Sequence, residues 1–167
     1  MHLRDRTPQD LPELAAIAAR VRAVDGYPIY LPRGDHLAFL TSPVALAAWV
    51  AEDDDGLAGH VALNATTSTA VTEAIRAAGI DGDLGVVSKL LVDPVRRRHG
   101  VAALLLDRAR RHADELGRVP VLDVIATSAA PIARYRREGW IELGRVAFTF
   151  PDGLAVEELV FRAPSGL

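Results

Sequence analysis

The chain has 167 residues, enough for one domain with a well-buried core and too few for two such domains. Its net charge of −3 at pH 7 and its pI near 5.9 exclude a protein that binds nucleic acid over its whole surface. Because it has no cysteine, disulfides, thiolate zinc sites and cysteine nucleophiles are excluded as well.

The amino-terminal end and the longest apolar run bear on location. Charged residues occur within the first six positions, which is not the pattern of a signal peptide. The longest apolar run covers residues 44–51, far short of the roughly 20 residues that span a membrane. We therefore expect a cytoplasmic protein that makes no membrane contact.

Hydrophobic periodicity and turn residues predict alternating strands and helices along the whole chain. The Asp-Gly pair at 55–56 and Pro-Asp-Gly at 151–153 indicate two hairpins, and the apolar run at 120–126 is typical of a strand buried on both faces. The predicted elements, in chain order, are a strand at 2–6, a helix at 8–23, a short helix at 35–40, strands at 47–52 and 57–64, a helical turn at 71–76, a strand at 86–93, a helix at 101–116, a strand at 120–126, a helix at 131–138 and strands at 140–150 and 154–161. This order predicts an α/β fold, a mixed sheet with helices on both faces, in a single domain over residues 1–167.

A basic segment between a strand and a helix carries the clearest functional signal. The strand stops at Pro94, arginines occupy 96–98, and Gly100 precedes a strongly amphipathic helix. The first amides of a helix lack intrahelical partners and lie at the positive end of its dipole. Gly100 lets a ligand approach the backbone, and arginines can add charge-assisted hydrogen bonds. This pattern predicts an anion site that suits a pyrophosphate.

Three short motifs follow one another along the chain between residues 89 and 140. Arg97-x-x-Gly100-x-Ala102 matches the pattern (Gln/Arg)-x-x-Gly-x-(Gly/Ala); Leu90-x-Val92-x-Pro94 precedes it, and Tyr135-x-x-x-Gly139-Trp140 follows it. Together they resemble the GNAT superfamily of acetyl-CoA-dependent N-acetyltransferases. Two positions depart from that family's second motif: Ser128 stands where asparagine is frequent, and Pro131 where a small residue is usual.

The resemblance implies a GNAT-like mixed sheet of seven strands, flanked by helices and splayed between strands 4 and 5, where acetyl-CoA lies. It implies that backbone amides of the basic loop bind the pyrophosphate and that the preceding strand pairs with the pantetheine arm. The backbone near Leu91 is implied to polarise the thioester carbonyl. The residues implied to bind the cofactor are Leu90, Leu91, Val92, Arg97, Arg98, His99, Gly100, Val101, Ala102, Ala103 and Ser128.

The same resemblance implies that Tyr135 protonates the departing thiolate and that a neutral primary amine attacks the thioester. The amine needs a proton acceptor, and Asp123, His60 and Glu73 are candidates because we expect them near the opening in the sheet; a water chain is the alternative. We therefore predict two catalytic residues, Tyr135 and Asp123. The residues expected to bind the acceptor substrate are Tyr27, Tyr30 and His60.

Other interpretations remain open at this point. Tyr135 can instead be a packing residue, and Asp123 a buried carboxylate paired with an arginine. The expected acceptor is a small-molecule amine; the alternatives are a protein amino terminus or lysine, or a non-catalytic CoA-binding module. The net negative charge of the chain and the lack of aromatic residues among its arginines argue against nucleic acid as a partner. Five histidines without ligand spacing argue against a metal, and homodimerisation stays open.

Overall fold

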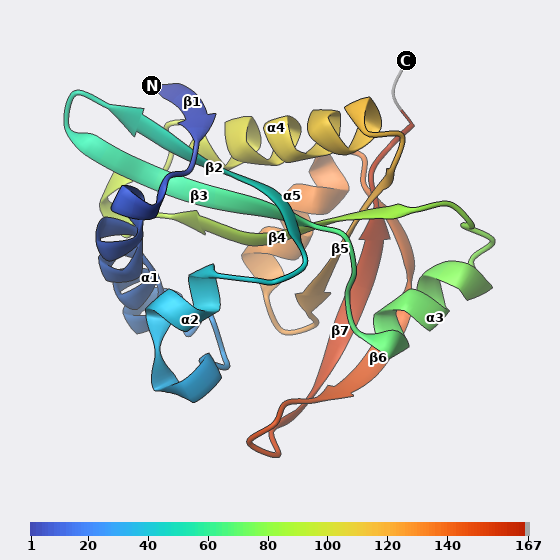
Figure 1. The fold of residues 1–167 in the computed structure, drawn as a ribbon. Helices are drawn as coiled ribbons and strands as arrows, with labels where there is room; N and C mark the ends of the chain where they lie inside the picture. The colour runs from blue at the N-terminus through green and yellow to red at the C-terminus, as the bar shows by residue number, and fades with distance from the viewer. Residues whose placement is uncertain (166–167) are drawn as a thin grey trace. The chain divides into compact units, whose positions relative to one another are not determined.

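The computed structural model describes residues 1–165, and the chain forms two compact units. Unit 1 comprises residues 1–64 and 87–112, and unit 2 comprises residues 65–86 and those from 113 onward. Within the described residues, seven strands form one mixed sheet in the order β1-β2-β3-β4-β5-β7-β6 (Figure 1). The predicted α/β class with a seven-stranded mixed sheet is therefore confirmed.

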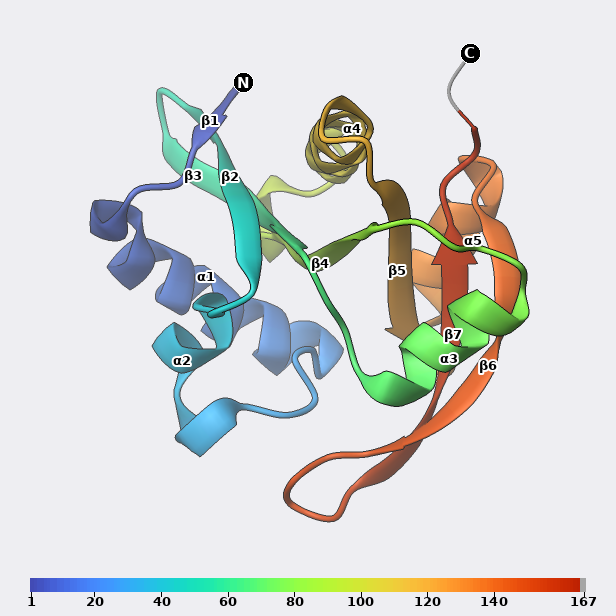
Figure 2. The same cartoon turned by 45° about the vertical axis from the view of Figure 1, so that its right-hand side comes forward.

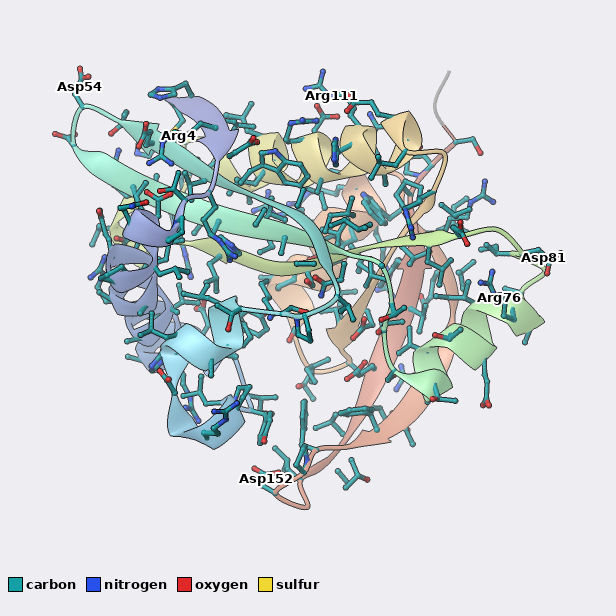
Figure 3. The ribbon with its side chains drawn as sticks, in the orientation of Figure 1. Arg4, Asp54, Arg76, Asp81, Arg111 and Asp152 are labelled. Atoms are coloured by element: carbon teal, nitrogen blue, oxygen red, sulfur yellow. The ribbon has the colours of Figure 1, made fainter. Side chains whose placement is uncertain are left out.

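Unit 1 contains the first three strands, which pair antiparallel, and the second part of β4. The hairpin predicted around residues 55–56 is confirmed, with Asp53 opposite Gly56 and Asp54 at its tip (Figure 3). The elements of unit 1 are β1 (His2–Asp5), α1 (Leu11–Asp25), α2 (His36–Leu40), β2 (Ala45–Asp53), β3 (Gly56–Asn64), β4 (Leu84–Val92) from residue 87 and α4 (Val101–Glu115) to residue 112.

Helices cover both faces of the sheet in unit 1. Helix α1 buries positions 14, 17, 18 and 21, one stripe at helical spacing, in a cluster with Val50, Leu57 and Leu91. On the other face the indole of Trp49 lies 5.1 Å from the His112 ring of α4, centroid to centroid. Strand β4 is thus held in a packed core, which fixes the backbone from which the basic loop starts.

Ion pairs fasten the edge strand β1 to its neighbours. The Arg4 guanidinium contacts the carboxylates of Asp10 and Glu52, each at 2.8 Å (Figure 3). The hydrogen bonds from Arg4 lower the pKa of Asp10 to about 2, even though partial burial of that carboxyl acts the other way. The start of the chain is therefore tied both to β2 and to the turn that leads into α1.

Unit 2 is built on the parallel pair of the sheet. Leu84–Val86 of β4 pair with the first three residues of β5, and the rest of β5 continues along β7 alone within this unit. Its further elements are α3 (Thr69–Ala77), β5 (Val119–Ile125), α5 (Ala129–Arg137), β6 (Ile141–Thr149) and β7 (Ala155–Arg162). The second predicted hairpin, β6–β7, is also confirmed, with Asp152 at its tip (Figure 3).

The two helices of unit 2 pack on opposite faces of its strands (Figure 2). Val71 and Ile75 of α3 form a cluster with Val121 and Val160, which are on one face. Phe161 points to the other face, where its ring lies 5.8 Å from that of Tyr135 in α5. Burial of β5 on both faces is confirmed for residues 120–122 only, because residues 123–125 are half-buried.

Candidate functional site

The turn between β4 and α4 is anchored by a buried carboxylate. Asp93 is 4% exposed; its carboxylate accepts hydrogen bonds from the Val95 amide at 3.3 Å and from Arg20 of α1 at 2.5 Å. Its own amide donates to the Ala58 carbonyl of β3 at 2.9 Å. Burial acts to raise the pKa of Asp93, but the hydrogen bonds from Arg20 and Val95 and the charges of Arg20 and Arg96 together outweigh it, so the pKa is lowered. The start of the loop is therefore fixed to α1 and β3.

Among the described residues, two of the basic side chains in the loop form ion pairs, and the next two do not. Arg96 forms an ion pair with Asp53, and Arg97 Nη1 donates to Asp25 Oδ1 at 3.1 Å. Arg98 and His99 are exposed, and neither side chain has a partner in the part of the chain that the structure describes. Arg97, a signature position, thus ties the loop to the end of α1, while the next two side chains stay available to a ligand.

The backbone at the start of α4 has amide hydrogens without an acceptor among the described residues. Arg98 and Gly100 have positive φ of 72° and 73°, and a Cβ on Gly100 would meet no atom within 4 Å. Among the first four helical amides, only Leu104 finds an acceptor within the described chain, the Gly100 carbonyl at 3.1 Å. The amides of residues 101–103 remain free, and this donor set, with its exposed cationic side chain, fits a pyrophosphate.

A left-handed residue interrupts β4 just before the segment expected to bind pantetheine. Lys89 has φ 55°, and its carbonyl is 2.8 Å from Nδ1 of His60. His60 Nε2 lies 3.1 Å from Arg6 Nη1. Because a guanidinium can only donate, Nε2 accepts and Nδ1 carries the hydrogen. Burial lowers the pKa of His60 to about 4, so the ring is neutral when it supports this irregularity.

His60, which we expected to contact substrate, has no exposed surface and uses both ring nitrogens inside unit 1. The sequence contained no signal for its role, since nothing in a lysine or its neighbours predicts positive φ within a strand. The Lys89 ammonium donates to the Thr41 carbonyl at 3.3 Å and lies 5.3 Å from the centre of the Phe39 ring. Burial, and then the charge of Arg6, lower its pKa to about 8.

Gly59 allows β3, β4 and α4 to come close together. A Cβ at this position would lie 2.6 Å from the Leu91 carbonyl oxygen, 2.9 Å from Leu105 and 3.2 Å from Val101. Leu91 is 1% exposed, whereas Leu90 and Val92 are half-buried. The missing side chain therefore sets the position of the strand and of the helix start that carry the predicted cofactor segment.

Tyr135 lies in unit 2, on the face covered by α5. Its ring is 8% exposed and packs 6.0 Å from Trp140 and 5.8 Å from Phe161, between ring centroids. Burial raises its pKa to about 12, so the phenol keeps its proton at neutral pH. No group in the described residues hydrogen-bonds this hydroxyl, which leaves the proton free for a ligand.

Asp123 lies on the opposite face of β5, beside a carboxyl that the sequence analysis missed. Its side-chain partners are Thr67, 3.5 Å from Oδ1, and Glu158 of β7, rather than an arginine. Glu158 is 6% exposed. A signal did exist in the sequence: because strand side chains alternate between faces, the consecutive Glu157 and Glu158 must send one carboxyl inward.

The other predicted residues fall in both units. In unit 1, Tyr27 and Tyr30 are half-buried, and Tyr27 packs edge-on against Phe39 at 5.9 Å. In unit 2, Ser128 occupies the N-cap of α5 without a capping hydrogen bond, and Glu73 is exposed on α3. These roles stay predictions.

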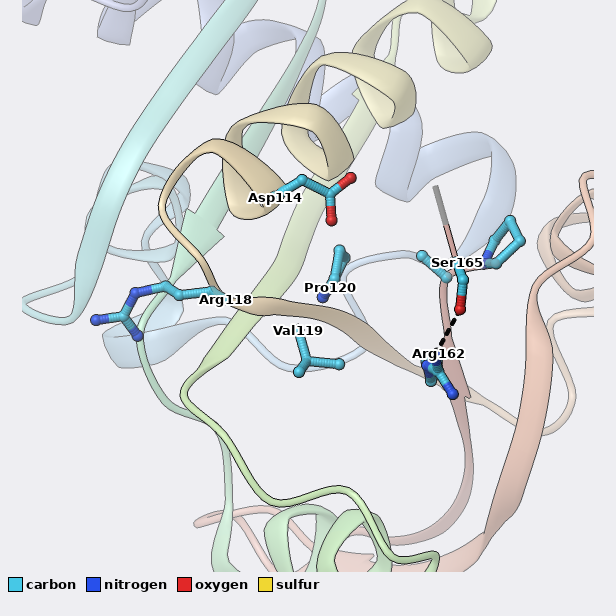
Figure 4. A pocket seen from close by; sticks show the side chains of 8 residues that line it. Asp114, Arg118, Val119, Pro120, Arg162 and Ser165 are labelled. Carbon is cyan, nitrogen blue, oxygen red and sulfur yellow. Dashed lines mark hydrogen bonds between the residues drawn. The ribbon is translucent and has the colours of Figure 1, made fainter. Parts of the chain in front are cut away.

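A cavity of about 250 Å³ opens in unit 2, and no predicted site residue lines it (Figure 4). Arg162 at its rim donates to Ser165 at 2.8 Å. Its lining residues are Asp114, Arg118, Val119, Pro120, Arg162, Ala163, Pro164 and Ser165. Residues 1–165 contain no cluster of side chains suited to a metal and no helix long and apolar enough to cross a membrane.

Comparison with known proteins places the chain in a family. The family model described as an acetyltransferase (GNAT) domain matches residues 45–142, more than half of the chain. No curated protein matches the sequence significantly.

Solved structures show the same fold. A ribosomal-protein-alanine N-acetyltransferase from Brucella melitensis is 21% identical, with a TM-score of 0.69 over 97% of this chain and 98% of that one. Arabidopsis thaliana NAA60 in complex with acetyl-CoA is 21% identical, with a TM-score of 0.70 over 96% of each chain. An N-acetyltransferase from Staphylococcus aureus is 16% identical, with a TM-score of 0.70 over 96% of each chain.

Gly59→Ala tests the close approach of β3, β4 and α4. We expect the added methyl group to lower the free energy of unfolding by about 1–3 kcal/mol and to weaken coenzyme A binding, because the Leu91 carbonyl must move. Thermal unfolding and a binding isotherm measure the two effects. Gly144→Ala, where a Cβ meets nothing within 4 Å, is the matched control. Equal results for the two variants would contradict the role given to Gly59.

Proposed function

The chain belongs to the GNAT superfamily of acetyltransferases, and from this premise we propose that it acetylates the primary amine of a small molecule. Acetyl-CoA is the donor, and the amine attacks it directly while both are bound. We further propose that the two units form one catalytic domain over residues 1–167. The family match at residues 45–142 supports this, since it draws on both units.

The observation that carries the proposal is the set of unpartnered amides at the start of α4. Three consecutive helical N–H groups, the left-handed Gly100 and the exposed Arg98 form a cationic surface made mainly of backbone. Such a surface recognises phosphate groups without a specific side chain. The half-buried Leu90 and Val92 lie in the strand that leads to it and would pair with the pantetheine arm.

Two groups of unit 2 supply proton transfers in this proposal. Tyr135 gives its hydroxyl proton to the sulfur as the thioester bond breaks, a role supported by its free hydroxyl and by the pKa of about 12 that keeps it protonated. Asp123 takes a proton from the acceptor amine. Its support is a half-buried carboxylate without an ion-pair partner in the described chain.

A protein amino terminus is the second candidate acceptor. It is favoured by the name of the Brucella relative, a ribosomal-protein-alanine N-acetyltransferase with nearly the same extent of chain. The half-buried aromatics Tyr27 and Tyr30 instead suit a small amine-bearing molecule.

A thiol-release assay with acetyl-CoA tests the function directly. The panel contains L-amino acids, spermidine, an aminoglycoside and a peptide that begins with alanine. Turnover with a small amine supports the proposal, and turnover with the peptide alone supports the second candidate. Coenzyme A binding without turnover of any amine would identify a non-catalytic CoA-binding module.

Gly100→Asp tests the pyrophosphate site. A Cβ at this position meets no atom within 4 Å, and the strain of a side chain at φ 73° is shared by the asparagine control, so we expect the fold to persist while the carboxylate repels phosphate and weakens coenzyme A binding about 10-fold or more. Titration calorimetry gives the affinity. Gly100→Asn, of the same size and uncharged, is the control and should lose much less, as should Arg97→Ala. An Asp isotherm that overlays the wild type would remove this loop from the site.

Tyr135→Phe tests the proton donor. The ring keeps its packing on Trp140 and Phe161, so folding and acetyl-CoA affinity should be unchanged. We expect kcat to fall by roughly 10²-fold, the usual scale for a positioned acid. Single-turnover kinetics isolates the chemical step. Wild-type rates there would return Tyr135 to a packing role.

Tyr27→Ala and Tyr30→Ala test the acceptor pocket. We expect KM for the amine to rise about 10-fold with little change in coenzyme A affinity, because the proposed acceptor contacts are removed; Tyr27→Ala also loses its packing on Phe39. Steady-state kinetics at saturating acetyl-CoA, together with thermal unfolding as a folding check, measures this. If KM for the amine is unchanged in both variants, this segment is scaffold.

A further inference from the structure

Two acidic side chains of unit 2 lie on one face of neighbouring strands. In the β5–β7 ladder Asp123 is opposite Val160, and Glu158 is opposite Ile125, so the two carboxyls are diagonal neighbours on the same face. When one of the two carboxyls is protonated, it can donate a hydrogen bond to the other, and this bond favours the protonated form of Glu158. The hydroxyl of Thr67, just before α3, donates to Oδ1 of Asp123 at 3.5 Å.

No cation compensates this pair within the described residues. On the helix that packs over this face, Glu73 and Arg76 are exposed, and Arg76 donates to the carbonyls of Ile80 and Gly82. On the opposite face, Arg145 and Glu157 pair with each other at 2.7 Å. Burial of Glu158, with the hydrogen bond and the charge of Asp123, raises its pKa to about 8.

A carboxyl at position 158 is costly for folding. Its strand neighbours at 159–161 are apolar and buried, and an apolar side chain there would avoid the loss of hydration. Two carboxyls in contact share one proton at neutral pH and give it up only as a pair. Such arrangements occur at sites where a base must operate near neutral pH.

We propose that Asp123 and Glu158 act together as one base, which takes the proton from the ammonium group of the acceptor before it attacks acetyl-CoA. This inference rests on the proposed function, and Glu158 is its new residue. Glu158 acts as a positioning residue, because it lies beside the partly exposed Asp123 on the same face and holds the proton that the pair shares.

The proton balance of the step is complete. When the pair has lost its shared proton, an ammonium N–H bond breaks, the proton joins the pair and the electron pair stays on nitrogen. The nitrogen then forms the C–N bond while the C–S bond breaks, and Tyr135 protonates the sulfur. The second proton of the nitrogen replaces the one given by Tyr135. The pair releases its extra proton to water, so the net products are amide, thiol and one proton.

Glu158→Gln tests the pair, because glutamine can still donate to Asp123 but cannot titrate. Glu157→Gln, the same change one residue away on the exposed face, is the matched control. The first measurement needs no acceptor: Tm of both variants and of the wild type at pH 5–9. The folded pKa of Glu158, about 8, lies above the ordinary value of 4.5, so wild-type stability falls as pH rises between these values and then levels off.

We therefore expect the Tm difference between Glu158→Gln and the wild type to rise by about 3 °C or more from pH 5 to pH 8 and to stay constant above. Glu157→Gln should show no such trend. A Tm difference for Glu158→Gln that is independent of pH would overturn the shared proton and with it the proposal.

The second measurement is kcat/KM at pH 6–9.5 with the panel amine of highest turnover. When kcat/KM of the wild type is divided by kcat/KM of Glu158→Gln at each pH, the effect of the ionisation of the amine itself cancels. We expect this ratio to rise about 10-fold across pH 8, with coenzyme A affinity unchanged. A flat ratio in an active enzyme overturns the base role and leaves the proposed function standing. If the wild type neither binds coenzyme A nor turns over any amine, both the base role and the proposed function are overturned.

Discussion

The hydrogen bond from His60 to the Lys89 carbonyl is the constraint on which the cofactor segment depends. It holds a strand residue at φ 55°, a conformation that a side chain of this size rarely adopts without outside support. Arg6 fixes the ring that makes this bond, and α1 packs over the strand that follows. The direction in which β4 leaves toward its loop is thereby set inside unit 1. Asp93 and Gly59 act on the same strand, the first by anchoring its end and the second by letting β3 approach.

Burial is the main influence on the proton state of Tyr135 and Glu158, which the proposals use, and of His60 and Lys89 in unit 1. It keeps His60 neutral, with a pKa near 4, and Tyr135 protonated, with a pKa near 12. It also brings Lys89 and Glu158, from opposite sides, to a pKa near 8. Loss of hydration favours the uncharged form of each group, so an acid becomes weaker and an amine more acidic. Ordinary side chains therefore acquire different proton affinities when they are buried to different extents.

The sequence predicted the elements well and the contacts of their side chains poorly. Strand and helix order, both hairpins and the loop before α4 follow from local patterns, which the chain itself carries in its turn residues and apolar spacing. The roles of His60 and Glu158 depend on partners distant in sequence: Lys89 is 29 residues from His60, and Asp123 is on another strand. Periodicity shows which way a strand residue points, but not which polar atom it meets there. For Glu158 the inward direction was available from the adjacent glutamates, and only its partner was not.

In the loop before α4, the motif residues shape the backbone more than they supply free positive charge. Arg97, the arginine of the motif, forms an ion pair with Asp25 and so fastens the loop to the end of α1. The groups that we propose bind phosphate are amides, and the left-handed residues 98 and 100 and the start of the helix set their direction. A glycine is needed where the chain turns through positive φ close to a ligand, whereas the cationic side chains around it can vary. In the proposed site, recognition by backbone would account for a short motif that tolerates arginine or histidine between its fixed positions.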